Sequence, residues 1–136
     1  MRVMAIDYGD ARTGIAISDP TGSIVGSTDV IHSRNREKTV ASLVERIRAS
    51  GAERLVMGLP RNMDGSEGPR AALYREFAAA LSEASGMEVV LWDERRTTVE
   101  AHNILSMNGY HGKRRKETVD AVAAGLILEG YLASLR

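Results

Sequence analysis

The chain has 136 residues, a length typical of one compact domain, so we expect residues 1–136 to form a single domain. Its 18 Lys and Arg residues balance its 18 Asp and Glu residues. That balance argues against a histone-like or tail-driven nucleic-acid binder but still permits a local basic patch. Cysteine is absent, which excludes disulfides, a thiolate nucleophile and a zinc site with cysteine ligands.

The first third of the chain predicts three strands joined by short loops. Val3–Ile6 and Thr13–Ser18 are short apolar runs, and Ser23–Ile31 is rich in β-branched residues. Between the last two runs, Asp19–Gly22 contains the Pro and Gly that a turn needs. Three successive strands with short connections favour an antiparallel meander.

The hydrophobic period then changes, and helices alternate with strands. Val40, Leu43 and Ile47 recur at helical spacing, which predicts a helix in this region. The elements expected here are a helix ended by Gly51, a strand over Arg54–Gly58, a loop over Gly58–Gly68, a helix from Pro69 to Gly86 and a strand over Glu88–Trp92.

The last third predicts two helices separated by a basic loop. Thr97 and Glu100 form a capping box that opens a helix running through Leu105. Lys113–Lys116 is the expected basic loop, and the final helix begins at Val119. The complete order βββαβαβαα predicts an α/β fold: a mixed five-stranded sheet with helices on both faces.

Neither end of the chain contains a targeting or membrane-spanning pattern. The N-terminal apolar run meets Asp7 at once, so no signal-peptide core forms. The apolar run Ala121–Leu128 is far too short for a bilayer. We therefore expect a cytoplasmic protein without a membrane partner.

Three acidic residues lie at positions that together suggest a catalytic site. Asp7 and Glu94 each follow an apolar strand, and Asp120 is expected in the first turn of the apolar last helix. Open α/β sheets build sites at the carboxyl ends of their strands. Clustered carboxylates repel one another unless a cation such as Mg²⁺ or Mn²⁺ neutralises them. A pair of such ions about 3.5–4 Å apart could act on a phosphodiester, so the acids suggest a metal-dependent nuclease.

Each acid also has a structural alternative. Asp7 could form a turn, and Asp120 could be stabilised by the positive end of its helix. Glu94 could pair with Arg95 or Arg96. The joint placement of the three acids favours the metal site over these separate explanations.

Four motifs in this sequence resemble those of the RuvX/YqgF family. They arrive in the family's order and span nearly the whole chain: Ala5–Asp19, Gly58–Ser66, Asp93–Thr98, and Lys116 with Val119–Ala124. The sequence departs from the family pattern at Ala5, where glycine is usual, and at Ala11, where a basic residue is common. Neither departure changes one of the acids.

The resemblance implies an RNase H-like fold, which agrees with the element order. It also implies that the catalytic and metal-binding residues are Asp7, Glu94 and Asp120, with Asp7 as the central ligand of Mg²⁺ or Mn²⁺. Members of the family are described as Holliday-junction resolvases or as nucleases that mature the 5′ end of precursor 16S rRNA. We therefore expect a hydrolase acting on precursor rRNA or branched DNA, as a monomer or a homodimer.

Basic residues near the acids are the expected phosphate contacts. They are Arg12, Arg95, Arg96, Lys113, Arg114, Arg115 and Lys116. A solvated loop is the alternative for the last four, but their closeness in sequence to Asp120 favours phosphate binding. The loop Arg61–Gly65 either binds substrate or supplies turn and capping groups for the next helix.

Two other functions stay open at this point. One is a non-catalytic nucleic-acid-binding or ribosome-assembly module on the same fold, which the intact trio of acids disfavours. The other starts from Asp7-x-Gly9, since a similar turn binds phosphate in sugar kinases and actin-like ATPases. Those proteins need a second related domain, for which 136 residues leave no room.

Overall fold

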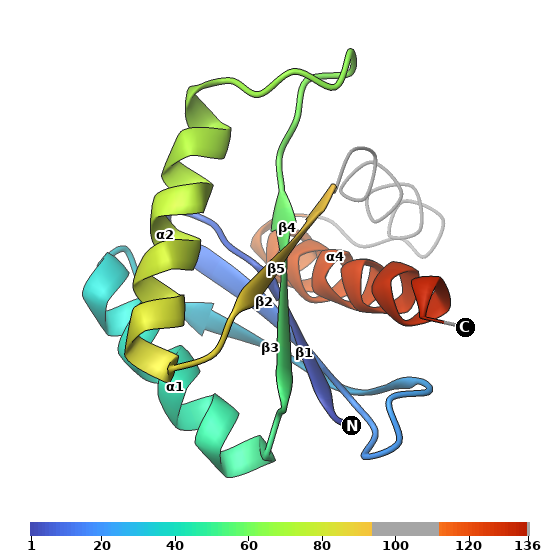
Figure 1. The fold of residues 1–136 in the computed structure, drawn as a ribbon. Coiled ribbons are helices and arrows are strands. Elements are labelled where there is room, and N and C mark those ends of the chain that lie inside the picture. Colours follow the sequence, from blue (N-terminus) through green and yellow to red (C-terminus); the bar gives the residue numbers. More distant parts are fainter. Residues whose placement is uncertain (94–111, 136) are drawn as a thin grey trace.

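The computed structural model describes residues 1–93 and 112–135. Its centre is a mixed five-stranded sheet (Figure 1). The strands are β1 (Val3–Asp7), β2 (Arg12–Ser18), β3 (Val25–His32), β4 (Arg54–Leu59) and β5 (Val89–Asp93). Their order across the sheet is β3-β2-β1-β4-β5. The first three strands pair antiparallel, as the predicted meander requires, whereas β4 pairs parallel with both β1 and β5. Strand β1 is therefore central.

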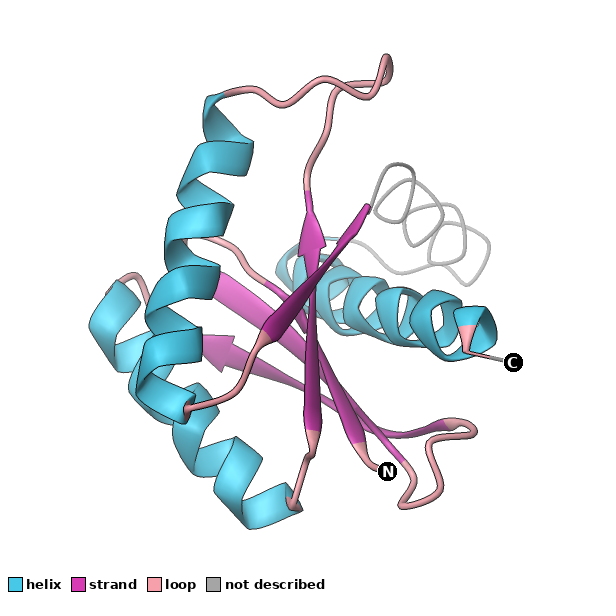
Figure 2. Ribbon diagram, viewed as in Figure 1, coloured by secondary structure: helices cyan, strands magenta, loops and turns pink. Residues whose placement is uncertain are grey.

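Helices cover both faces of this sheet (Figure 2). They are α1 (Arg36–Ser50), α2 (Pro69–Ser85) and α4 (Gly112–Ser134). Side chains alternate along a strand, so β1 contributes to two apolar layers. Met4 and Ile6 pack with α1 and α2, while Val3 and Ala5 pack with α4. This arrangement confirms the expected α/β class.

The ends of α1 and α2 are set by local sequence. Gly51 and Gly86 follow the two helices with φ of 72° each, a left-handed conformation that favours glycine. Pro69 occupies the first turn of α2, where its missing N–H costs no hydrogen bond. Asn35 accepts a hydrogen bond from the Lys38 N–H and so caps α1. The predicted ends of both helices are confirmed.

One expectation about the last third of the chain is wrong. Lys113–Lys116 is not a loop, because α4 already begins at Gly112. Apolar spacing marks only the apolar face of a helix, whereas Lys and Arg are good helix formers that leave no such pattern in the sequence. Asp120 therefore lies about two turns into α4 instead of in its first turn. The helix dipole acts mainly within the first turn, so it does not explain Asp120.

The predicted helix from Thr97 to Leu105 lies outside the described residues. In the ranges that the structure does describe, no helix combines the length and the apolar character that crossing a membrane requires.

Candidate active site

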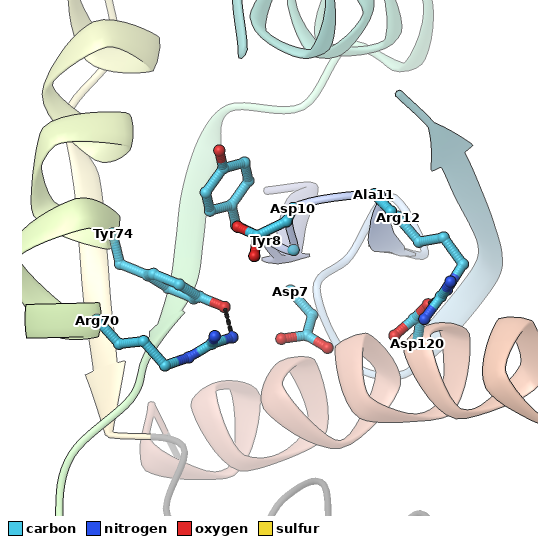
Figure 3. Close-up of a pocket in the computed structure, with 9 residues that line it drawn as sticks. Asp7, Tyr8, Asp10, Ala11, Arg12, Arg70, Tyr74 and Asp120 are labelled. Carbon is cyan, nitrogen blue, oxygen red and sulfur yellow. Dashed lines mark hydrogen bonds and ion pairs between the residues drawn. The ribbon is translucent and has the colours of Figure 1, made fainter. Parts of the chain in front are cut away.

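Asp7 occupies the last position of the central strand β1. It follows Val3 and Ala5 at two-residue spacing, which places it on the face of the sheet that α4 covers. Its side chain points toward α4 and lines a pocket (Figure 3). Asp7 is thus held by a strand that is paired on both sides, which makes it a well-fixed group for chemistry.

Helix α4 crosses strand β2 so closely that only glycine fits at the crossing. A Cβ atom on Gly14 would lie 2.1 Å from the backbone oxygen of Asp120. Because Gly14 is the register partner of Asp7, this contact brings Asp120 to the end of β1. Gly14 is not among the predicted site residues, although a glycine inside a strand is a known signal of close backbone approach.

The two acids line one pocket of about 330 Å³. Asp7 comes from the first strand and Asp120 from the last helix. The loop Tyr8–Ala11, the first residue of β2 and two residues of α2 complete the lining. This pocket is open at the carboxyl end of β1, where an α/β sheet is expected to bind its ligand. The structure therefore brings together two of the three predicted acids.

Arg12 forms an ion pair with Asp120. The Arg12 Nε lies 2.8 Å from Asp120 Oδ2, and the two side chains are 33% and 20% exposed. Arg12 begins β2, directly after the loop that leaves Asp7. The predicted phosphate contact at Arg12 is thus at the site, and in this structure its charge balances that of Asp120.

Helix α2 forms the opposite wall of the pocket through Arg70 and Tyr74. The Tyr74 hydroxyl accepts a hydrogen bond of 2.9 Å from Arg70 Nη2 (Figure 3). Tyr74 is 4% exposed, and its ring meets that of Tyr8 edge-on at a centroid distance of 5.3 Å. Neither residue is among the predicted site residues, and their only signal in the sequence is an Arg and a Tyr spaced i, i+4 at the start of a helix.

The loop Arg61–Gly65 is stabilised largely by its own polar groups. Asn62 and Asp64 both hydrogen-bond to Ser66, which supports the turn interpretation of this segment. The capping part of that alternative is wrong, because the N-cap of α2 is Gly68 and no side chain caps it. Nearby, the guanidinium of Arg75 bonds to Glu67 and holds the pKa of that carboxyl below its usual value.

Residues 1–134 match the model of a protein family described as "RuvX: Holliday junction resolvase". The chain belongs to the RuvX family. Relatives with high similarity cover almost the same length. A protein named "Putative pre-16S rRNA nuclease" from Pelotomaculum thermopropionicum is 44% identical over 135 residues, covering 98% of this chain and 88% of the relative. A protein of the same name from Moorella thermoacetica is also 44% identical, covering 99% and 96%.

Solved structures share the fold of this RuvX-family chain. RuvC of T. thermophilus in complex with a Holliday junction substrate superposes with a TM-score of 0.63, at 12% identity and with 99% and 96% of the two chains covered. The Fowlpox virus resolvase bound to Holliday junction DNA superposes with a TM-score of 0.60 at 14% identity, and 99% of each chain is covered. These neighbours confirm the expected RNase H-like architecture.

Two of the four RuvX motifs supply residues at or beside the pocket. The first motif supplies Asp7, Arg12 and Gly14, and the fourth supplies Asp120. Of the third motif, Glu94, Arg95 and Arg96 lie outside the described residues. The same holds for the side chains of Lys113–Lys116, although their backbone is helical. Among the residues that are described, no group of three or more His, Cys, Asp or Glu is placed to hold a metal ion.

Proposed function

We propose that this protein is a metal-dependent nuclease that hydrolyses phosphodiester bonds of structured nucleic acid. The observation that carries the proposal is the meeting of Asp7 and Asp120 in one pocket, with the cations Arg12 and Arg70 beside them. Carboxylates at the carboxyl end of a central strand suit phosphoryl chemistry, and the flanking arginines suit a phosphate backbone. Membership of the RuvX family supports the same interpretation.

The donor set fits a hard divalent cation. Asp7 and Asp120 offer oxygen ligands, which Mg²⁺ and Mn²⁺ prefer, and we propose Glu94 as the third ligand. Such an ion would lower the pKa of a bound water and stabilise negative charge on the phosphoryl oxygens. Arg12 donates a hydrogen bond to Asp120 Oδ2, so an ion that took this oxygen would compete with the pair and would release Arg12 toward a phosphate.

We propose precursor 16S rRNA as the substrate, since the relatives at 44% identity are named for it. The second candidate is a Holliday junction, which the family's description and the RuvC and Fowlpox virus complexes favour. A resolvase makes two symmetric cuts and needs a two-fold dimer, whereas a trimming enzyme can act as a monomer. Solution mass with and without a junction therefore helps to separate the two candidates.

Cleavage of both substrates under controlled metal conditions tests the proposal. The purified protein is incubated with a precursor 16S rRNA fragment or a four-way DNA junction, in Mg²⁺, Mn²⁺ or excess chelator. We expect cleavage with at least one metal and none above background with chelator, because the ion would supply both the lowered pKa of the attacking water and the stabilisation of phosphoryl charge. Undiminished cleavage in chelator would refute the metal requirement. Binding without cleavage of either substrate would favour the non-catalytic module instead.

The basic first turn of α4 is expected to add phosphate contacts. Replacing Lys113, Arg114, Arg115 and Lys116 by glutamine keeps good helix formers but removes four charges. On duplex DNA, the slope of log K against log salt should become less steep by about 0.9 for each phosphate that the variant no longer neutralises. Glutamine at Lys38 and Arg48, exposed on α1, is the matched control and should leave the slope unchanged. An unchanged slope in the α4 variant would remove this turn from the interface.

A further inference from the structure

A second arginine approaches the acids from the side opposite Arg12. Arg70 lies in the first turn of α2 and lines the pocket together with Asp7 and Asp120. Figure 3 shows Asp7 between the two arginines, with Arg12 on the side of β2 and Arg70 on the side of α2. The carboxylates are thus flanked by positive charge on two walls.

The side chain of Arg70 is held in place by a buried partner. Its Nη2 donates to the Tyr74 hydroxyl at 2.9 Å, and its Cζ lies 5.4 Å from the centroid of the Tyr74 ring. Tyr74 is almost fully buried, so it cannot follow a moving arginine. Because an exposed arginine normally has many rotamers, holding it beforehand lowers the entropy lost on binding a ligand.

An aromatic cluster connects this partner to the catalytic strand. Tyr8, the neighbour of Asp7, stacks on Phe77 with ring centroids 3.9 Å apart and meets Tyr74 edge-on. Phe77 is fully buried in the layer under α2. The position of Arg70 is therefore set relative to Asp7 through packed rings.

The side of the pocket formed by Arg70 and Tyr74 of α2 suits an anion. The guanidinium of Arg70 lines the pocket beside the Tyr74 hydroxyl, a neutral group that accepts one of its hydrogen bonds. The first turn of α2 contains no acidic residue and no side-chain cap, and the N-terminal end of a helix favours negative charge. The planar fork of a guanidinium also matches the paired oxygens of a phosphate.

We propose that Arg70, positioned by Tyr74, binds a backbone phosphate adjacent to the phosphodiester that is cleaved. The inference rests on the proposed nuclease function, because it takes nucleic acid as the ligand of this pocket. Arg70 touches the substrate, and Tyr74 is a positioning residue that acts through it. Since the contact is to phosphate, it adds affinity and alignment without sequence preference.

Binding measured without cleavage tests the inference. Fluorescently labelled four-way DNA junction and precursor rRNA fragment are titrated with Asp7→Asn protein, with and without Arg70→Gln. We expect Arg70→Gln to weaken binding about tenfold or more, because it removes a charged hydrogen bond. On the DNA probe it should also flatten the salt slope by about 0.9. The affinity of Arg70→Lys should lie between those of the parent and of Arg70→Gln, because lysine keeps the charge but not the planar fork.

Two further variants separate positioning from simple removal of charge. Tyr74→Phe keeps the packed ring and removes the hydroxyl, so it should weaken binding less than Arg70→Gln and leave the salt slope unchanged. Arg75→Gln, on the same helix but outside the lining of the pocket, is the matched control and should bind like the parent protein. A structural role for Arg70 would lower the melting temperature without changing the slope.

Each outcome decides a separate question. Equal binding and equal slope for Arg70→Gln and its parent would overturn the inference and leave the nuclease proposal standing. Binding that depends on Arg70, in a protein whose wild type cleaves neither substrate, would refute the nuclease and retain the phosphate contact. Failure of both the wild type and the Asp7→Asn parent to bind either probe would overturn both.

Discussion

Replacing Asp7 by asparagine is expected to reduce cleavage by more than about 100-fold, since mutation of groups that merely support metal ligands already costs about 10–100-fold. The folded structure should survive, because asparagine has the same shape and the strand bearing it is paired on both sides. In metal-free protein the melting temperature should stay equal or rise, because the substitution removes one of two carboxylates that share the pocket. Cleavage rates and thermal melts measure both effects.

The effect of metal ions on the melting temperature tests Asp7 as a metal ligand without measuring cleavage. A cation that binds only the folded state raises its stability with concentration. We expect Mg²⁺ or Mn²⁺ to raise the melting temperature of the wild type and to have a much smaller effect on Asp7→Asn. Asp29→Asn is the matched control: its exposed carboxylate on β3 pairs with Arg46, away from the pocket, so cleavage should be unchanged. Full activity of Asp7→Asn would refute its assignment.

The second large effect is expected from Gly14→Ala, which adds one methyl group where α4 crosses β2. The new Cβ would lie 2.1 Å from the oxygen and 2.7 Å from the carbon of the Asp120 carbonyl. Both are backbone atoms, so no rotamer change relieves the clash and the helix must move away. Overpacking of this kind costs about 1–3 kcal/mol of stability. A shift of about 1 Å in a catalytic group can reduce activity by about 100-fold.

A second glycine on the same helix provides the control. Gly125 also lies in α4, but a Cβ there would meet no atom within 4 Å. Gly125→Ala should therefore raise the free energy of unfolding by up to about 1 kcal/mol through helix propensity. Its cleavage should equal that of the wild type. Urea unfolding and cleavage assays compare the two variants, and wild-type stability and activity in Gly14→Ala would show that α4 does not hold Asp120 in this way.

The order of the elements could be predicted because it depends on local patterns. The change from strand runs to helical spacing after Ile31 and the glycines that end α1 and α2 act within a few residues. The start of α4 was predicted wrongly for the same reason. Its first turn contains Lys113–Lys116, and a polar turn on a helix has no apolar period to mark it.

The candidate site could be predicted only in part. The motifs identified Asp7 and Asp120 and placed Arg12 near them, and the structure gathers all three around one pocket. The roles of Glu94, Arg95 and Arg96 stay predictions, because these residues lie outside the described ranges. Arg70 and Tyr74 could not be found from the sequence, since nothing local says which face of α2 borders the acids.

The sequence by itself determined the strands, the ends of α1 and α2 and the residue types able to bind metal and phosphate, because propensity, periodicity and capping are local properties. Only the tertiary structure decided which of those residues meet. Arg12 and Asp120 are 108 residues apart, and they pair because α4 packs against the sheet at Gly14. Likewise, Arg70 faces Asp7 because the rings of Tyr8, Tyr74 and Phe77 pack together. Such contacts depend on how packed layers cross in space, which no short stretch of sequence specifies.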